Sequence, residues 1–285
     1  GCSGLTELTL PNSVKSIGDG AFADCSGLEK ITVESGNSCY DSRDNCNSII
    51  ETETNTLIAG CKNSVIPNSV TSIGDSAFEG CTGLTELTLP KSVTSIGDSA
   101  FYGCTGLTEL TLSNSLKSID GSVFSGCSSL TKLTLPNSLE SIGEHAFSDC
   151  RGLTELTLPN SVTSIGNGAF GGCSGLTELT LPNSVTSIGN SAFYYCSELT
   201  ELILPDSVTS IGDAAFSECS GLSKITSLAG IPPVFDRCMF VGEEFGEVNK
   251  ANCELIVPEE SITAYKQAKG WNEFSNIRGF VGEKK

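Results

Sequence analysis

Nine of the 14 cysteines recur at one position of a repeat, and their thiols are the most prominent reactive groups in the sequence. Seven of them follow one another at intervals of 23 residues: Cys81, Cys104, Cys127, Cys150, Cys173, Cys196 and Cys219. Cys2 and Cys25 have the same interval. Zinc sites use close pairs such as CxxC, which do not occur here. Stacked thiols about 5 Å apart would be within disulfide reach. Because each of these cysteines has the same neighbours, we nevertheless predict that they are small buried apolar residues and not disulfide partners.

The remaining five cysteines lie outside this column: Cys39, Cys46, Cys61, Cys238 and Cys253. In an exported protein, a disulfide could join Cys39 to Cys46, or Cys238 to Cys253. The sequence leaves both pairings open, because it is also consistent with free thiols.

Glutamates also share one repeat position, and adjacent copies about 5 Å apart would resemble the carboxylate pair of a retaining glycosidase. Acid and base roles require two carboxyl groups in different environments, whereas these repeated glutamates have the same neighbours. The only histidine, His145, is interpreted as a turn residue in place of serine. We therefore predict no catalytic residue, no metal site, no cofactor and no enzyme activity.

The same glutamates, with a neighbouring row of threonines, are predicted to form an exposed face suited to binding. Lysine replaces glutamate at this repeat position in three copies, Lys30, Lys132 and Lys224, and relieves repulsion between like charges. The predicted face consists of Glu86, Thr88, Glu109, Thr111, Lys132, Thr134, Glu155, Thr157, Glu178, Thr180 and Glu201.

These side chains must be positioned by the 23-residue unit, of which CTGLTELTLPKSVTSIGDSAFYG is one copy. Apolar and polar side chains alternate in the second half of residues 84–89, which predicts a short strand. Val93–Ile96 predict a second strand. Ala100 and Phe101 are expected in a tight helical turn that fills the interior. Ordering one unit costs more free energy than burying its few apolar side chains returns, so stability requires stacked units. The sequence predicts a leucine-rich-repeat solenoid of the α/β horseshoe-like class, mostly short parallel strands.

The predicted domains are a solenoid of about nine coils over residues 1–228 and a capping region over residues 229–285. Residues 34–65 interrupt the period and are expected to form a hairpin that projects from the solenoid. Its predicted contact residues are Ile50, Glu51, Glu53, Asn55 and Leu57. In the cap, residues 259–268 predict a short helix, and Trp271, Phe274 and Ile277 are expected to cover the end of the core.

The formal charge of −18 disfavours nucleic acid and anionic membranes as partners. No apolar run of transmembrane length occurs, and no export signal is visible. Because Gly1 and Cys2 already lie inside a repeat, we expect a mature or trimmed end.

The pattern LxxLxLPxSxxxIGxxAFxxC resembles the repeats of the BspA-like family of bacterial and protozoan surface proteins. The resemblance runs from Gly1 to about Ser227 and includes residues 47–74 and 257–277. Ser113 in place of proline and the swapped Asp120–Gly121 pair are local departures, expected to distort one turn. The resemblance implies a surface-exposed or secreted protein, adhesion to host or neighbouring-cell proteins in some members, and no catalytic residues.

Two functions remain open. The first is a monomeric binding module for extracellular or cell-surface proteins and glycoproteins. The second is a structural stalk or scaffold within a larger surface protein, which the near-identical repeats favour because a dedicated site normally needs side chains found in one repeat only.

Overall fold

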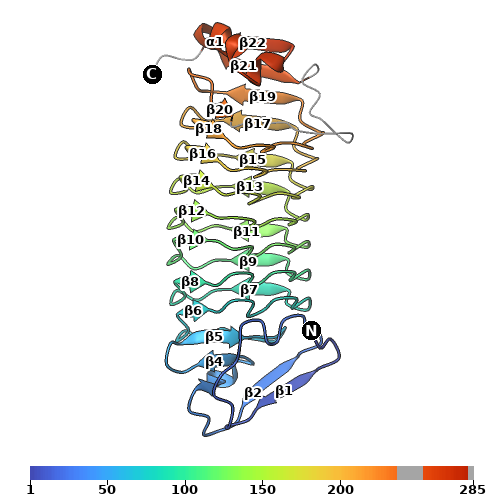
Figure 1. The fold of residues 1–285 in the computed structure, drawn as a ribbon, viewed down its shortest axis with the longest axis vertical. Helices are drawn as coiled ribbons and strands as arrows, with labels where there is room; N and C mark the ends of the chain where they lie inside the picture. The colour runs from blue at the N-terminus through green and yellow to red at the C-terminus, as the bar shows by residue number, and fades with distance from the viewer. Residues whose placement is uncertain (236–252, 282–285) are drawn as a thin grey trace. The chain divides into compact units, whose positions relative to one another are not determined.

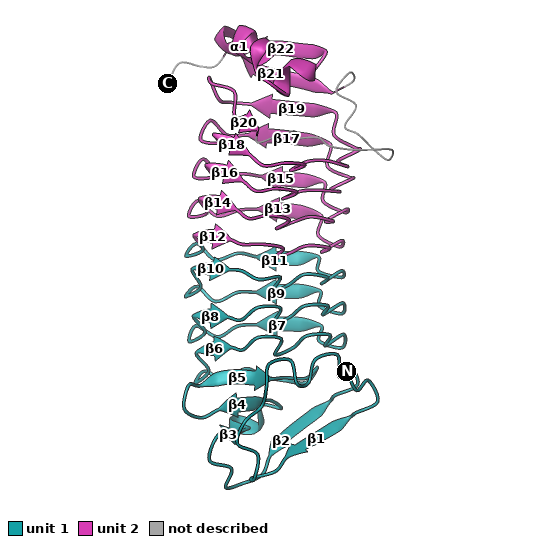
Figure 2. Cartoon of the chain, in the orientation of Figure 1, with its two compact units in different colours: residues 1–139 teal, residues 140–285 magenta. Residues whose placement is uncertain are grey.

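The computed structural model describes residues 1–235 and 253–281. The chain divides into two compact units, residues 1–139 and 140–285, shown in teal and magenta in Figure 2. Each unit is built from stacked coils of the repeat, with short strands along its sides (Figure 1). No helix in the described part of the chain is long and apolar enough to cross a membrane.

Unit 1 contains eleven strands and one 3₁₀ turn. They are β1 (Glu7–Leu10), β2 (Lys30–Val33), β3 (Tyr40–Asp41), the 3₁₀ turn Arg43–Asn45, β4 (Ile49–Glu51), β5 (Thr56–Ala59), β6 (Ser72–Ile73), β7 (Glu86–Thr88), β8 (Ser95–Ile96), β9 (Glu109–Thr111), β10 (Ser118–Ile119) and β11 (Lys132–Thr134).

The described residues of unit 2 contain further strands, two 3₁₀ turns and one short helix. They are β12 (Ser141–Ile142), β13 (Glu155–Thr157), β14 (Ser164–Ile165), β15 (Glu178–Thr180), β16 (Ser187–Ile188), β17 (Glu201–Leu204), β18 (Ser210–Ile211), β19 (Lys224–Ser227), β20 (Val234–Phe235), β21 (Glu254–Pro258), the 3₁₀ turn Glu259–Ser261, α1 (Ile262–Gln267), the 3₁₀ turn Trp271–Glu273 and β22 (Asn276–Phe280).

Each regular coil has the two predicted strands on different sides, and equivalent strands of successive coils pair in parallel. Glu86, Leu87 and Thr88 of β7 face Glu109, Leu110 and Thr111 of β9. Ser164 and Ile165 of β14 face Ser187 and Ile188 of β16 in the same way. The partners are 23 residues apart, so one repeat makes one coil, and the predicted parallel-strand solenoid is confirmed.

The third side of the coil, predicted as a tight helical turn, is turned but not helical. Ser99 has a φ of 54°, in the left-handed region, and so interrupts any right-handed helical run. Its N–H donates to Gly121 O of the next coil at 2.7 Å, and Phe101 N–H donates to Val123 O at 2.9 Å. Backbone groups that a helix would pair internally therefore join neighbouring coils instead.

Phenylalanine rings from this third side stack inside each unit. The Phe78 and Phe101 ring centroids are 5.0 Å apart, and the Phe147 and Phe170 centroids are 5.4 Å apart. Such ring pairs add about 0.5–1.5 kcal/mol beyond the burial of their surface. Leucines, isoleucines and cysteines complete the buried columns.

The insertion does not project, so that prediction was wrong. β4 and β5 form the predicted antiparallel hairpin, but β5 also pairs in parallel with β6, which makes the hairpin part of a five-stranded sheet. Ile49, Ile50 and Leu57 are fully buried. Consecutive apolar residues such as Ile49 and Ile50 put side chains on both faces of a strand, so the hairpin is stable only when both faces are covered.

The C-terminal region of unit 2 contains the predicted short helix and one strand that was not predicted. β21 pairs with β19 and continues the repeat strands, and α1 confirms the predicted helix. Trp271 is fully buried, and its Nε1–H donates to Pro233 O at 2.9 Å. Ile277 lies in β22, which pairs in parallel with β21 and was not predicted. Cys238 lies outside the described residues.

Candidate functional site

The predicted binding residues lie on the exposed side of the longer strands. In β7, Glu86 and Thr88 point outward while Leu87 is buried, and β9, β13 and β15 repeat this alternation. Because side chains alternate along a strand, burial of the leucine keeps its two neighbours in solvent. We call the eleven exposed residues the strand face: in unit 1 Glu86, Thr88, Glu109, Thr111, Lys132 and Thr134, and in unit 2 Glu155, Thr157, Glu178, Thr180 and Glu201.

Charges on the strand face are partly paired. Lys132 Nζ lies 3.1 Å from Glu109 Oε2, and Lys224 Nζ lies 3.1 Å from Glu201 Oε2. Glu155 faces Glu178 in register, with like charges side by side. Solvent screens such exposed groups, so each interaction changes stability by less than about 1 kcal/mol. Within each unit, the strand face is thus a row of regularly spaced, well-solvated acidic and hydroxyl groups.

The hairpin contributes little exposed surface. Ile50 and Leu57 are buried, and Asn55 Oδ1 accepts a hydrogen bond from Arg43 at 2.9 Å. Glu51 accepts one from the Thr54 hydroxyl at 2.6 Å. Of the five predicted hairpin residues, only Glu53 is exposed. Two of these five residues therefore belong to the core.

The seven repeated cysteines from Cys81 to Cys219 are buried thiols, as predicted, whereas Cys2 is exposed and Cys25 is only partly buried. Cys104 Sγ donates to Phe78 O at 3.2 Å, and Cys219 Sγ donates to Phe193 O at 3.2 Å. Burial raises the pKa of the Cys127 and Cys173 thiols to about 12. Because the thiolate is the reactive form, these groups are chemically inert at neutral pH. Cys39 and Cys46 are not joined by a disulfide.

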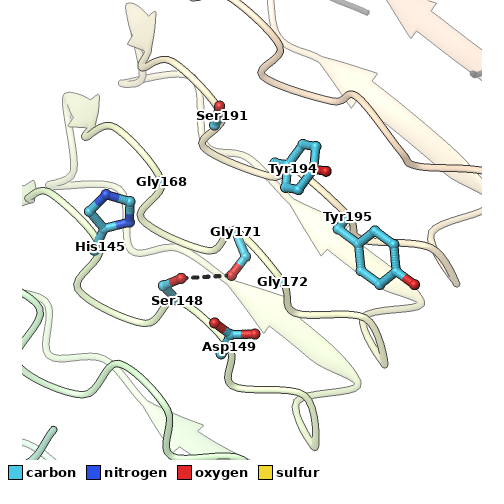
Figure 3. Close-up of a pocket in the computed structure, with 9 residues that line it drawn as sticks. All are labelled: His145, Ser148, Asp149, Gly168, Gly171, Gly172, Ser191, Tyr194 and Tyr195. Carbon is cyan, nitrogen blue, oxygen red and sulfur yellow. Dashed lines mark hydrogen bonds between the residues drawn. The ribbon is translucent and has the colours of Figure 1, made fainter. Parts of the chain in front are cut away.

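A second surface feature in unit 2 was not predicted. It lies on the turns that precede the repeated cysteines, residues 144–149, 167–172 and 190–195, which we call the turn edge. A notch of about 200 Å³ opens there (Figure 3). It is lined by His145, Ser148, Asp149, Gly168, Gly171, Gly172, Ser191, Tyr194 and Tyr195.

Glycines of the middle coil make room for the notch. The His145 ring covers Gly168, where an added Cβ would collide with it. A Cβ on Gly172 would lie 2.7 Å from Asp149 Oδ1. Tyr194 and Tyr195 come from the next coil, with ring centroids 6.2 Å apart. Figure 3 shows the imidazole, the carboxylate and the two phenols around a floor of glycine backbone.

The signal for the notch was present in the sequence. Gly168 and Gly171 in GNGAFGGC replace the larger residues that both neighbouring coils carry at these positions, and the next repeat has two adjacent tyrosines. The predicted role of His145 as a turn residue is confirmed, since it is exposed and has a φ of 53°. Within residues 1–235 and 253–281, no group of three or more His, Cys, Asp or Glu side chains could hold a metal ion.

Comparison with known proteins places the repeat in a family. Residues 1–59, 50–175 and 141–240 match a family model described as the BspA type leucine-rich repeat region, in six copies. No curated protein matches the chain significantly.

Several solved structures are similar. A leucine-rich repeat protein from Bacteroides ovatus is 28% identical, with a TM-score of 0.66 over 99% of this chain and 74% of that one. One from Eubacterium ventriosum is 28% identical, with a TM-score of 0.55 over 67% of this chain and 58% of that one, less than two thirds of its length. The pneumococcal vaccine antigen PcpA is 21% identical, with a TM-score of 0.50 over 98% of this chain and 68% of that one, which indicates a shared fold alone.

Proposed function

Because the chain belongs to the family of BspA-type leucine-rich repeat proteins, we propose that it is a non-catalytic binding module of a cell-surface or secreted protein. Its partner is an extracellular or cell-surface protein or glycoprotein. The observation that carries this proposal is the strand face, where exposed acidic and hydroxyl side chains alternate with buried leucines.

The chemistry of the strand face suits a partner with basic groups. Glu155 and Glu178 lie in register without a lysine between them, and the whole chain has a charge of −18. Complementary charge mainly accelerates association and selects partners, and it adds less to affinity. The outward threonines add hydroxyls that donate and accept hydrogen bonds. The expected interaction is therefore salt-sensitive, with a basic surface on the partner.

The test is biolayer interferometry of the purified chain against a panel of purified matrix and mucosal glycoproteins. We expect saturable binding to at least one of them, weakened at least tenfold by the double substitution Glu155→Lys and Glu178→Lys. A matched control with the same change of charge, Glu198→Lys with Asp206→Lys, alters exposed residues outside both the strand face and the turn edge and should change affinity less than threefold. Equal losses in both variants would refute a role for the strand face.

A structural stalk is the second candidate, supported by the regularity of the coils, because equal coils make an even spacer. The same panel separates the two functions. A stalk binds no member saturably, whereas a binding module retains at least one.

A further inference from the structure

The notch exists because one coil lacks side chains that its neighbours carry. Gly171 occupies the repeat position of Ser148 in the coil before it and of Tyr194 in the coil after it. Unit 1 offers a comparison, because Tyr102 holds the position of Tyr194 and follows Glu79 one coil earlier. A long side chain therefore precedes Tyr102, whereas bare backbone precedes Tyr194, whose ring lines the notch.

Tyr195 is held in a conformation that costs free energy. Its φ is 58°, and the equivalent position before each cysteine is also left-handed in the other coils. Glycine or aspartate holds most of these positions, including Gly172, Gly126 and Asp149. A bulky L-residue there costs about 1–2 kcal/mol, and such strain is characteristic of functional sites. Tyr195 is nevertheless 49% exposed, so packing against the core does not account for its presence.

The lining indicates a small ligand that is polar but uncharged. The notch of about 200 Å³ is smaller than the roughly 300–1,000 Å³ of sites for drug-sized molecules, so it admits one small ring or side chain. Asp149 Oδ1 is already paired with Arg151 Nη2 at 3.0 Å, so a cationic ligand would have to displace a guanidinium. An anion would meet that carboxylate. A neutral ligand meets neither obstacle.

Two kinds of lining groups further restrict the chemical class of the ligand. Tyr194 and Tyr195 are 42% and 49% exposed and present aromatic surface, which takes an apolar C–H face. The imidazole of His145, the hydroxyl of Ser191 and the phenol groups lie around it, and they can exchange hydrogen bonds with hydroxyls. A molecule with one C–H face and a rim of hydroxyls is a pyranose.

We propose that the notch is a carbohydrate-binding subsite that receives one neutral sugar ring of a glycan, stacked on Tyr194 and Tyr195 at the edge of His145. The subsite is separate from the strand face, and its ligand is defined by different chemistry. Glycan binding at the notch and protein binding at the strand face can therefore be tested independently.

The test begins with a glycan array of neutral, sialylated and sulfated oligosaccharides probed with the purified chain. The neutral oligosaccharide retained most strongly is then titrated by isothermal calorimetry. We expect Tyr194→Ala to weaken its binding at least tenfold. Tyr102→Ala is the matched control, because Tyr102 has the same repeat position and 45% exposure but no glycine before it, and it should change affinity less than twofold.

A second variant fills the notch without removing an aromatic ring. A Cβ on Gly171 would lie 3.3 Å from Ser191 O, a tight contact that a shift of a few tenths of an ångström relieves, and Gly171 has no left-handed φ that would disfavour a side chain. Glu79 shows that the repeat tolerates a long one at this position. Gly171→Gln should abolish glycan binding while the circular dichroism spectrum and melting temperature stay unchanged.

Three results would overturn the proposal. One is an array on which no neutral glycan is retained above background. Another is an equal loss for Tyr194→Ala and Tyr102→Ala. The third is binding of an arginine-rich peptide, but not of a neutral sugar, that Gly171→Gln abolishes, which would identify the notch as a pocket for a protein side chain. The double substitution of Glu155 and Glu178 should leave sugar binding intact, which separates this result from the test of the strand face.

Discussion

The strand face and the turn edge belong to the same coils, yet they differ in how closely they follow the repeat. On the strand face of unit 2, Glu155 and Thr157 recur as Glu178 and Thr180 with the same register and exposure. On the turn edge, Ser148 is followed by Gly171 and then by Tyr194 at one position. Both surfaces are nevertheless carried by the same buried columns.

This difference shows that stacking constrains the interior side chains of the coils and leaves the outward side chains free. Stacking requires apolar side chains inside and equal coil lengths, and both surfaces meet that requirement. Outward side chains are free to vary, and variation in adjacent coils creates a concave site such as the notch. A regular face offers many equal weak contacts, whereas an irregular edge offers one shaped site.

The largest expected effect comes from the thiol column beneath the turn edge. Below about pH 8.5, both the folded and the unfolded state keep the thiols protonated. Burial raises the pKa of the Cys127 and Cys173 thiols to about 12, so between about pH 9 and 12 only the unfolded state loses these protons. Each such thiol then lowers the free energy of unfolding by about 1.4 kcal/mol per pH unit.

The measurement for this column is urea unfolding followed by circular dichroism at pH 8, 9 and 10. Cys173→Ala should make the free energy of unfolding fall less steeply with pH, by about 1.4 kcal/mol per pH unit, which is the contribution of one thiol. Cys2→Ala, at an exposed position, should leave this slope unchanged. Identical slopes for wild type and Cys173→Ala would contradict the assigned cause.

The second effect comes from the ring column. Phe170 is fully buried and stacks between Phe147 and Phe193 with centroids 5.4 Å and 5.5 Å away. Phe170→Ala should lower the free energy of unfolding by about 3–5 kcal/mol, because it leaves a cavity. Tyr194→Ala, on the exposed edge of the next coil, should cost about 0.5 kcal/mol or less. Similar losses for both in guanidinium unfolding would remove the distinction between interior and edge.

The sequence predicted what the period dictates. Equal spacing of Leu87, Leu110 and their counterparts established the coil, its strands and the exposed face, because a 23-residue period leaves one register in which leucines and cysteines coincide. The place of the hairpin was missed, although adjacent Ile49 and Ile50 indicated burial on both faces. The notch was missed because its lining comes from three coils, so no single copy of the repeat contains it.

The third effect comes from the backbone strain at Tyr195 on the turn edge. Tyr195→Gly relieves a left-handed strain of about 1–2 kcal/mol, offset by about 0.5–1 kcal/mol for the greater freedom of glycine in the unfolded chain. We expect a net gain of about 0.5–1 kcal/mol together with weaker sugar binding. Tyr194→Gly lacks the strain, because Tyr194 has no left-handed φ, and should destabilise the protein. A loss of stability for Tyr195→Gly in thermal unfolding would show that its ring supports the fold.

The smallest effect concerns Lys224, the ion-pair partner of Glu201 on the strand face. Lys224 is paired with Glu201 at 3.1 Å and lies in register between Glu201 of β17 and Glu254 of β21. Lys224→Glu would place three carboxylates side by side, and like charges on neighbouring strands cost up to about 1 kcal/mol. Most of this loss should disappear in 1 M NaCl, where the screening length falls to about 3 Å.

Lys224→Gln is the matched control for that substitution, because it removes the ion pair without adding a charge. We expect Lys224→Gln to fall between wild type and Lys224→Glu at low salt, and all three proteins to converge at high salt in urea unfolding. A loss that persists at high salt would mean that the aliphatic stem of Lys224 packs against the neighbouring strands. In that case the strand face contributes to the fold itself, and its side chains are less free to vary than those of the turn edge.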